Sequence, residues 1–97
     1  MLSSKQRSYL RSLANTIAPI FQIGKGGINE NMIRQINEAL EVRELIKATV
    51  LNNAQIETKV IAQEISKETR SELVQVIGNK FVLYKESREN KAIVLPK

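Results

Sequence analysis

The feature that most constrains the fold is a strand-like run that passes through a glycine loop into an amphipathic helix and on to a second strand-like run. The first run covers residues 18–23, and the loop is Gly24-Lys25-Gly26-Gly27. The second run, 45–51, is apolar and rich in β-branched residues, as is typical of a central strand. Because a β-α-β crossover makes its two strands parallel, the sequence predicts an α/β fold.

Two helices besides the crossover helix are expected. Ser3 and Gln6 form a capping-box pattern, which predicts a first helix over residues 4–15. Its apolar positions at helical spacing are Tyr9, Leu10, Leu13 and Ile17. The crossover helix is expected over 30–42 with Asn29 as its N-cap, and a third helix over 56–69.

A hairpin completes the predicted order of elements. The runs 73–77 and 81–84 flank Gly78-Asn79-Lys80, a turn sequence that permits positive φ. The order is therefore α-β-α-β-α-β-β, with a four-stranded mixed sheet packed against helices in two or three layers. A chain of 97 residues is one domain, 1–97, in which the tail 87–97 either docks on the body or frays.

Several kinds of chemistry are disfavoured by the composition. Cysteine and histidine are both absent, which removes the commonest zinc ligands and the commonest general base. We expect no catalytic residues, no metal and no cofactor. Three carboxylates, Glu38, Glu41 and Glu44, lie close together on or just beyond one helix, and we interpret them as a solvated face. Because no apolar run approaches the length of a membrane span, we expect a cytoplasmic protein that does not associate with a membrane. We also expect a monomer.

Basic side chains gather toward the two ends of the chain. The first 29 residues carry four basic and no acidic side chains, and the last 20 carry five basic and two acidic ones. Lys5, Arg7 and Arg11 spread over two turns of the first helix, while Lys80 and Lys85 flank the last strand. Such a distribution suits a protein that meets a polyanion, although a solubilising excess of charge explains it too. We place the neighbouring Tyr84 in the core.

The glycine loop is a candidate phosphate site. A helix N-terminus supplies free N–H groups and partial positive charge, and Lys25 adds a full charge. A nucleotide P-loop is disfavoured because no hydroxyl residue follows Lys25, and a dinucleotide fingerprint is incomplete because its third glycine position holds Asn29. A plain strand-to-helix turn is the simpler alternative, but such a turn needs no lysine. A Gly-x-x-Gly pattern also clamps nucleotide backbones in some RNA-binding domains.

Taken in order, five segments resemble the CRM domain family, the chloroplast RNA splicing and ribosome maturation domain. These segments are Leu10-Arg11-Ser12-Leu13-Ala14, Ile23-Gly24-Lys25-Gly26-Gly27-Ile28, Glu44-Leu45-Ile46-Lys47, Leu73-Val74-Gln75-Val76-Ile77-Gly78 and Val82-Leu83-Tyr84-Lys85. The resemblance spans residues 3 to about 86. It implies a fold similar to the C-terminal domain of translation initiation factor three, and RNA binding without catalysis.

The resemblance also implies a partner and a set of site residues. For a free-standing bacterial member it implies association with precursors of the large ribosomal subunit, and so with structured ribosomal RNA. By position, the RNA contacts fall on Gly24, Lys25, Gly26, Gly27, Lys5, Arg7, Arg11, Lys80 and Lys85. Two departures concern the contacts at the hairpin: Asn79 stands where members often have a basic residue, and the histidine common around Asn15 is missing.

The leading hypothesis is therefore a non-catalytic RNA-binding protein that assists assembly of the large ribosomal subunit. The alternative is a protein-protein interaction module with an incidental basic surface, which docks a partner through acidic helix faces and the apolar residues 93–95. A small phosphotransfer enzyme is a third hypothesis.

Overall fold

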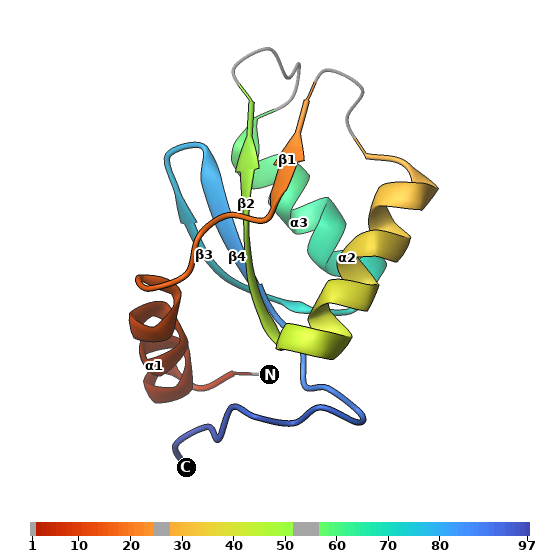
Figure 1. Ribbon diagram of the computed structural model, residues 1–97. Helices are drawn as coiled ribbons and strands as arrows, with labels where there is room; N and C mark the ends of the chain where they lie inside the picture. The colour runs from red at the N-terminus through yellow and green to blue at the C-terminus, as the bar shows by residue number, and fades with distance from the viewer. Residues whose placement is uncertain (1, 25–27, 52–56) are drawn as a thin grey trace.

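The computed structural model describes residues 2–24, 28–51 and 57–97, and these form three helices and one four-stranded sheet (Figure 1). The elements are α1 (Ser4–Ala14), β1 (Phe21–Ile23), α2 (Glu30–Arg43), β2 (Leu45–Val50), α3 (Thr58–Thr69), β3 (Glu72–Ile77) and β4 (Lys80–Tyr84). This order and the α/β class confirm the prediction, and the observed boundaries lie within three residues of the predicted ones. None of the described helices is long and apolar enough to cross a membrane.

Local signals explain where the first two helices begin. At α1, the Gln6 backbone N–H donates to Ser3 Oγ at 3.1 Å, and the Ser3 N–H donates to Gln6 Oε1 at 3.0 Å, which completes the predicted capping box. At α2, the Met32 N–H donates to Asn29 Oδ1 at 2.9 Å, so Asn29 is the predicted N-cap. These two caps fix the residues at which α1 and α2 begin, one before β1 in the chain and the other after it.

The sheet has the strand order β1-β2-β4-β3. β1 lies parallel to β2, with Phe21 opposite Ala48, which confirms the predicted crossover. β4 is antiparallel to both β2 and β3, and Gly78, at φ 57°, forms the predicted hairpin turn with Asn79. Lys80, expected in that turn, instead begins β4 opposite Thr49.

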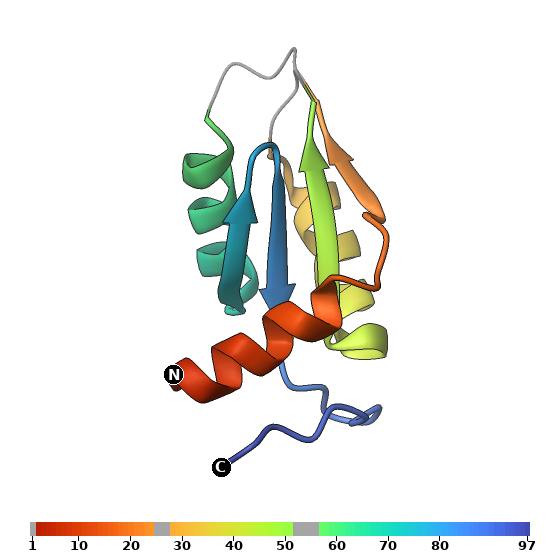
Figure 2. The same ribbon diagram turned by 90° about the vertical axis from the view of Figure 1, so that its left-hand side faces the viewer.

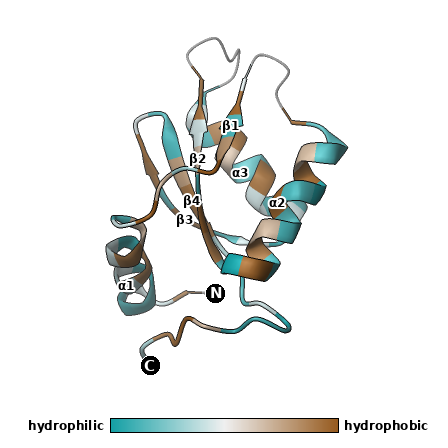
Figure 3. Ribbon diagram, viewed as in Figure 1, coloured by the Kyte–Doolittle hydropathy of each residue, from teal (hydrophilic) through white to brown (hydrophobic). Residues whose placement is uncertain are grey.

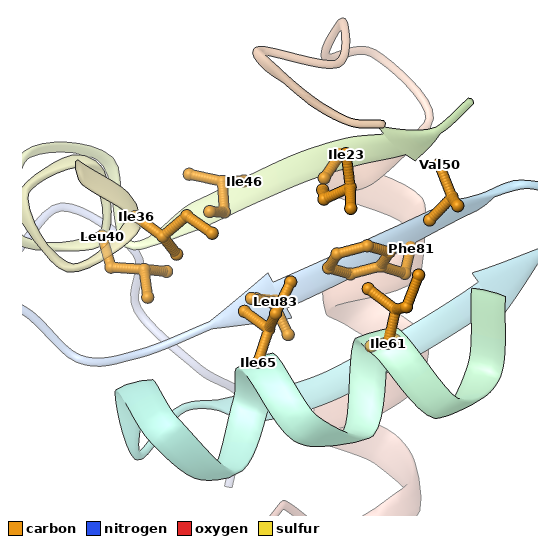
Figure 4. Close-up of a cluster of buried hydrophobic side chains, with 11 residues drawn as sticks. Ile23, Ile36, Leu40, Ile46, Val50, Ile61, Ile65, Phe81 and Leu83 are labelled. Atoms are coloured by element: carbon orange, nitrogen blue, oxygen red, sulfur yellow. The ribbon is translucent and has the colours of Figure 1, made fainter. Parts of the chain in front are cut away.

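The sheet separates two apolar clusters and so gives the molecule three layers. α2 and α3 pack on one face, over the larger cluster, in which Phe81 and Leu83 of β4 meet side chains from both helices (Figure 4). α1 packs on the other face, where Leu10 and Ala14 contact a smaller cluster that includes Tyr84 (Figure 2). Tyr84 is buried, as predicted.

One residue of the predicted apolar stripe of α1 is placed differently. Tyr9 is 39% exposed, whereas Leu10 of the same helix is fully buried. Because successive helical residues are about 100° apart and this short helix presents only a narrow stripe to the sheet, one of two adjacent apolar residues must face away. The prediction that Tyr9 belongs to the buried stripe is therefore wrong.

Of the two alternatives for the tail 87–97, the structure shows the docked one. Ile93 and Leu95 pack against the smaller apolar cluster, in a stretch that is coloured as hydrophobic in Figure 3. The Gln6 side chain of α1 donates to the Pro96 carbonyl at 3.0 Å. The tail thus lies against the end of the sheet that α1 also covers.

The carboxylates that hold this tail correct the interpretation of Glu41 and Glu44 as a solvated face. Glu44 is 1% exposed, and its carboxylate accepts the backbone N–H groups of Ser87, Ala92 and Ile93 at 2.8 to 2.9 Å. Glu41 accepts the N–H groups of Arg88 and Glu89, both at 3.0 Å. Glu38 alone of the three is exposed.

Candidate nucleic-acid interface

The glycine loop begins where the two parallel strands end. Gly24 follows β1, and the Leu51 N–H, just after β2, donates to the Ile23 carbonyl at 2.8 Å. In open α/β sheets, ligands bind outside the carboxyl ends of the parallel strands, which is where the loop starts. The predicted contacts Lys25, Gly26 and Gly27 lie outside the described residues.

Packing does not require glycine at position 24. Among the described residues, the nearest neighbour of a Cβ built on Gly24 is the Leu51 Cδ1 atom, at 3.5 Å, which is an ordinary van der Waals separation. The φ of Gly24 also lies outside the left-handed region. The described part of the fold therefore accepts an alanine here, and close approach of a ligand to the backbone is the function that glycine would serve.

The three cations of α1 do not form one patch. Lys5 and Arg11 are exposed, but Arg7 is half-buried, and its guanidinium donates to the carbonyls of Leu73 and Val74. The pairing of β3 with β4 shifts register between Leu73 and Gln75, so these carbonyls belong to a β-bulge. Arg7 thus satisfies backbone oxygens where the ladder is disrupted, and Lys5 and Arg11 remain available to a partner.

The two cations of the last strand are also far apart. Lys80 begins β4 and Lys85 follows its end, which separates their Cα atoms by about 17 Å along the strand. Lys85 Nζ donates to the Thr69 carbonyl at 3.0 Å, at the carboxyl end of α3, where the helix dipole favours a cation. Lys80 is exposed at the opposite end of the sheet, the end at which β1 and β2 lead into their loops.

The structure adds a cation that the sequence analysis overlooked. Lys47 lies on β2, on the same face as Lys80, and both side chains line a hollow of about 70 Å³ together with Asn15, Gln75, Ile77 and Val82. The signal was present, because placing Ile46, Ala48 and Val50 on one face of a strand puts Lys47 and Thr49 on the other. This alternation alone does not mark Lys47 as a binding residue, because a solvated strand face commonly carries polar side chains.

Carboxylates are kept away from this part of the surface. All ten acidic residues are glutamates, and they lie on or at the ends of α2 and α3, at the start of β3, or after β4. α1, β1, β2 and β4 therefore contain none. Within the described ranges, no cluster of acidic side chains could hold a metal ion. α1 carries three basic side chains and no acidic one, whereas α2 and α3 with their caps carry seven acidic and five basic ones.

Glu41 and Glu44, with the tail N–H groups that they accept, form what we call the tail clasp, and both carboxylates have pKa values below the ordinary range. The N–H groups of Arg88 and Glu89, with the Ser87 hydroxyl, lower the pKa of Glu41 to about 2. Burial opposes ionisation of Glu44, but the N–H groups of Ala92, Ile93 and Ser87 outweigh it and lower the pKa of this group as well. Both groups are therefore charged near neutral pH and hold the tail.

Comparisons with known proteins match this chain along nearly its whole length. The family model of the CRS1 / YhbY (CRM) domain matches residues 2–85. The chain is 58% identical to the Probable RNA-binding protein YqeI of Bacillus subtilis, covering 99% of this chain and all of that protein. It is 38% identical to a protein of Haemophilus influenzae named RNA-binding protein, covering 99% and 96% of the two chains.

A solved structure shows the same fold. The solution structure of the hypothetical protein SAV1595 from Staphylococcus aureus superposes with a TM-score of 0.82. It is 64% identical in sequence, and the match covers 99% of this chain and all of that one. The three-layer arrangement described above is therefore also the fold of that chain.

Proposed function

Because this chain belongs to the CRS1 / YhbY (CRM) domain family, we propose that it is an RNA-binding protein without catalytic activity. The names of the Bacillus and Haemophilus relatives support an RNA partner. The observation that carries the proposal is the separation of charge: α1, β1, β2 and β4 contain basic side chains and no carboxylate, and the one carboxylate of the sheet, Glu72, lies at the end of β3 away from Lys80. A surface of this kind attracts the phosphates of RNA.

The proposed contacts are the residues of the predicted site. A cation that is exposed is given a larger part than one that already hydrogen-bonds within the protein. The loop of Gly24, Lys25, Gly26 and Gly27 holds phosphates, and the exposed cations Lys5, Arg11 and Lys80 extend the contact. Arg7 and Lys85 hydrogen-bond to backbone carbonyls of the protein, so we assign them a smaller part. In this mechanism specificity comes from the shape of the RNA.

A more specific proposal concerns which RNA the protein binds and in which particle. We propose that the protein associates as a cytoplasmic monomer with precursors of the large ribosomal subunit and assists their assembly, as the family resemblance implies. Sedimentation of a cell extract through a gradient tests this. The protein is expected to migrate with large-subunit precursors and to leave those fractions after ribonuclease treatment, because RNA provides the attachment.

The loop mechanism is tested with Lys25→Glu, compared with Lys59→Glu on the exposed side of α3. Fluorescence anisotropy with a structured fragment of large-subunit RNA gives the affinity at several salt concentrations. Lys25→Glu is expected to weaken binding and to flatten the log-log salt dependence by about 0.7 to 0.9 for each phosphate that the protein no longer neutralises. Lys59→Glu should change little. If Lys25→Glu keeps the wild-type affinity and slope while staying folded, the mechanism is wrong.

One observation favours the alternative, a protein-interaction module. A groove of about 900 Å³ lies between α2 and α3, and its lining includes the apolar Ile33 and Val42 and five glutamates. The apolar tail offers less support, because Ile93 and Leu95 already pack on the body. Association with precursor particles that survives ribonuclease would favour this second function.

A further inference from the structure

α1 covers only part of its face of the sheet and leaves the rest open. The helix crosses the end of the sheet that holds Leu45, Val74 and Tyr84, as Figure 2 shows. At the other end, one row of residues runs across all four strands: Gln22, Thr49, Lys80 and Ile77 are paired in register. We call this row, together with Lys47 and Gln75, the open sheet face.

The open sheet face has the charge of an anion-binding surface. Lys47 lies opposite Val82, and Lys80 opposite Thr49, which makes the two lysines diagonal neighbours with Cα atoms about 7 to 8 Å apart. The hollow between them is lined by polar and apolar side chains, and no carboxylate of the described residues takes part in it. Two cations this close, with no acid beside them, complement a pair of phosphates.

Base stacking is not available on this face. The chain has four aromatic residues, and Phe81 and Tyr84 are buried. Phe21 packs against the larger cluster on the opposite side of the sheet, and Tyr9 lies on α1. Proteins that bind unpaired RNA rely on exposed aromatic side chains as stacking platforms. The hollow, at about 70 Å³, also offers room for about two water molecules but not for a base.

The polar side chains suit the backbone of a double helix instead. Gln22, Thr49 and Gln75 carry amide and hydroxyl groups that can both donate to and accept from a ribose 2′-hydroxyl. The row across four strands is about 14 Å wide, since neighbouring strands lie about 4.8 Å apart. The minor groove of A-form RNA is wide and shallow and displays 2′-hydroxyls between its phosphates.

We propose that the open sheet face binds the sugar-phosphate backbone of base-paired RNA, with Lys47 and Lys80 on phosphates and Gln22, Thr49 and Gln75 on ribose hydroxyls. This inference rests on the proposed function and adds to it the class of RNA recognised and four residues that the family resemblance did not indicate.

The test measures affinity for three probes of equal length by fluorescence anisotropy: an RNA hairpin, the DNA hairpin of the same sequence, and an unpaired RNA. The RNA hairpin is expected to bind tightest. Lys47→Gln and Lys80→Gln should each weaken hairpin binding about five- to tenfold at about 0.1 M salt and reduce the salt slope by about 0.9. Gln22→Ala and Gln75→Ala should lower the preference for RNA over DNA and leave the slope unchanged.

Lys67→Gln, on the exposed side of α3, is the matched control and should bind as the wild type does. Lys80 is exposed, so its variant stays informative even if Lys47→Gln, at a half-buried position, alters the fold. Tighter binding of the unpaired RNA, or unchanged hairpin affinity of both lysine variants, would overturn the inference. If Lys25→Glu still weakens binding in that case, the proposed function stands; if the wild type binds no RNA, both fail.

Discussion

At the scale of single residues, Glu44 shows why a strained backbone position is kept. Its φ is 64°, a region that favours glycine, yet the residue is a buried glutamate that ends α2. A glycine would adopt this φ without strain but would leave the N–H groups of Ser87, Ala92 and Ile93 without their acceptor. The hydrogen bonds of the carboxylate therefore explain why position 44 is a glutamate and not a glycine.

Glu44→Gln should lower the free energy of unfolding by about 2 kcal/mol, because an amide accepts hydrogen bonds more weakly than a carboxylate and brings an N–H₂ group against the same donors. Urea denaturation followed by circular dichroism measures the change. Glu38→Gln, on the exposed side of the same helix, is the control and should shift stability by less than about 0.5 kcal/mol. Equal effects of the two substitutions would contradict the role given to Glu44.

A substitution at Gly24 is expected to weaken RNA binding without changing the stability of the fold. Gly24→Ala should change the unfolding free energy by less than about 0.5 kcal/mol, because among the described residues the added Cβ meets only Leu51, at an ordinary distance. It should weaken RNA binding, since a Cβ keeps a phosphate from the backbone of the loop. Thermal unfolding and anisotropy on the same sample check both parts. An alanine variant that is stable and binds RNA as well as the wild type would show that glycine serves no ligand at this position.

At the scale of elements, the tail depends on charged carboxylates and should be released by acid. The pKa of Glu41 is lowered from its ordinary value of 4.5 to about 2, and that of Glu44 is lowered too. A depressed carboxylate pKa contributes stability above the unfolded value that is lost as pH falls through the folded value. The clasp is thus complete above about pH 5 and weakens progressively toward about pH 2.

Nuclear magnetic resonance tests this release through the backbone amides of Arg88, Glu89 and Ile93. Their signals should move toward random-coil positions between about pH 5 and about pH 2, because protonated carboxyls no longer attract the N–H groups. The amides of Val82 and Leu83 in β4 are internal controls and should shift later or not at all. Tail amides that move only together with β4 would indicate global unfolding in place of release.

The docking of α1 depends on one of its cations and not on another. Arg7→Ala should destabilise the fold by about 1 to 2 kcal/mol, since two bulge carbonyls lose their donor, and should speed hydrogen exchange in β3. Arg11→Ala, exposed on the same helix, should leave stability nearly unchanged and weaken RNA binding. Chemical denaturation and anisotropy on both variants measure these effects. The reverse pattern, with Arg7 important only for RNA, would refute this division of roles.

At the scale of the whole molecule, RNA affinity should depend more on where the charged side chains lie than on the net charge. The net charge is +5, and the double variant Arg11→Gln with Glu64→Gln keeps it. RNA affinity should still fall, because the cation that is removed lies on α1, which has no acidic residue, and the acid that is removed lies on α3. The double variant Lys67→Gln with Glu64→Gln also keeps +5 and should bind as the wild type does. Equal affinities of the two double variants would mean that net charge alone attracts RNA.

The helices, the strands and the parallel pair were predictable from the amino-acid sequence, because they depend on signals a few residues apart. The capping box of Ser3, the N-cap Asn29 and the turn at Gly78 act within their own segments. The helix between β1 and β2 returns the chain to the end of the sheet where β1 began, so the two strands run parallel. The burial of Tyr84 was predicted as well. The RNA contacts assigned to the glycine loop remain a prediction.

The polar groups that meet across the chain could be identified only once it was folded. Glu44 and Ser87 are 43 residues apart, Arg7 and Leu73 are 66 apart, and no local pattern links either pair. Sequence patterns show which residues are apolar or charged, but they do not give the partners of a carboxylate or a guanidinium, because those depend on how the elements pack. For the same reason, the place of β4 between β2 and β3, and the meeting of Lys47 with Lys80, became visible only in the tertiary structure.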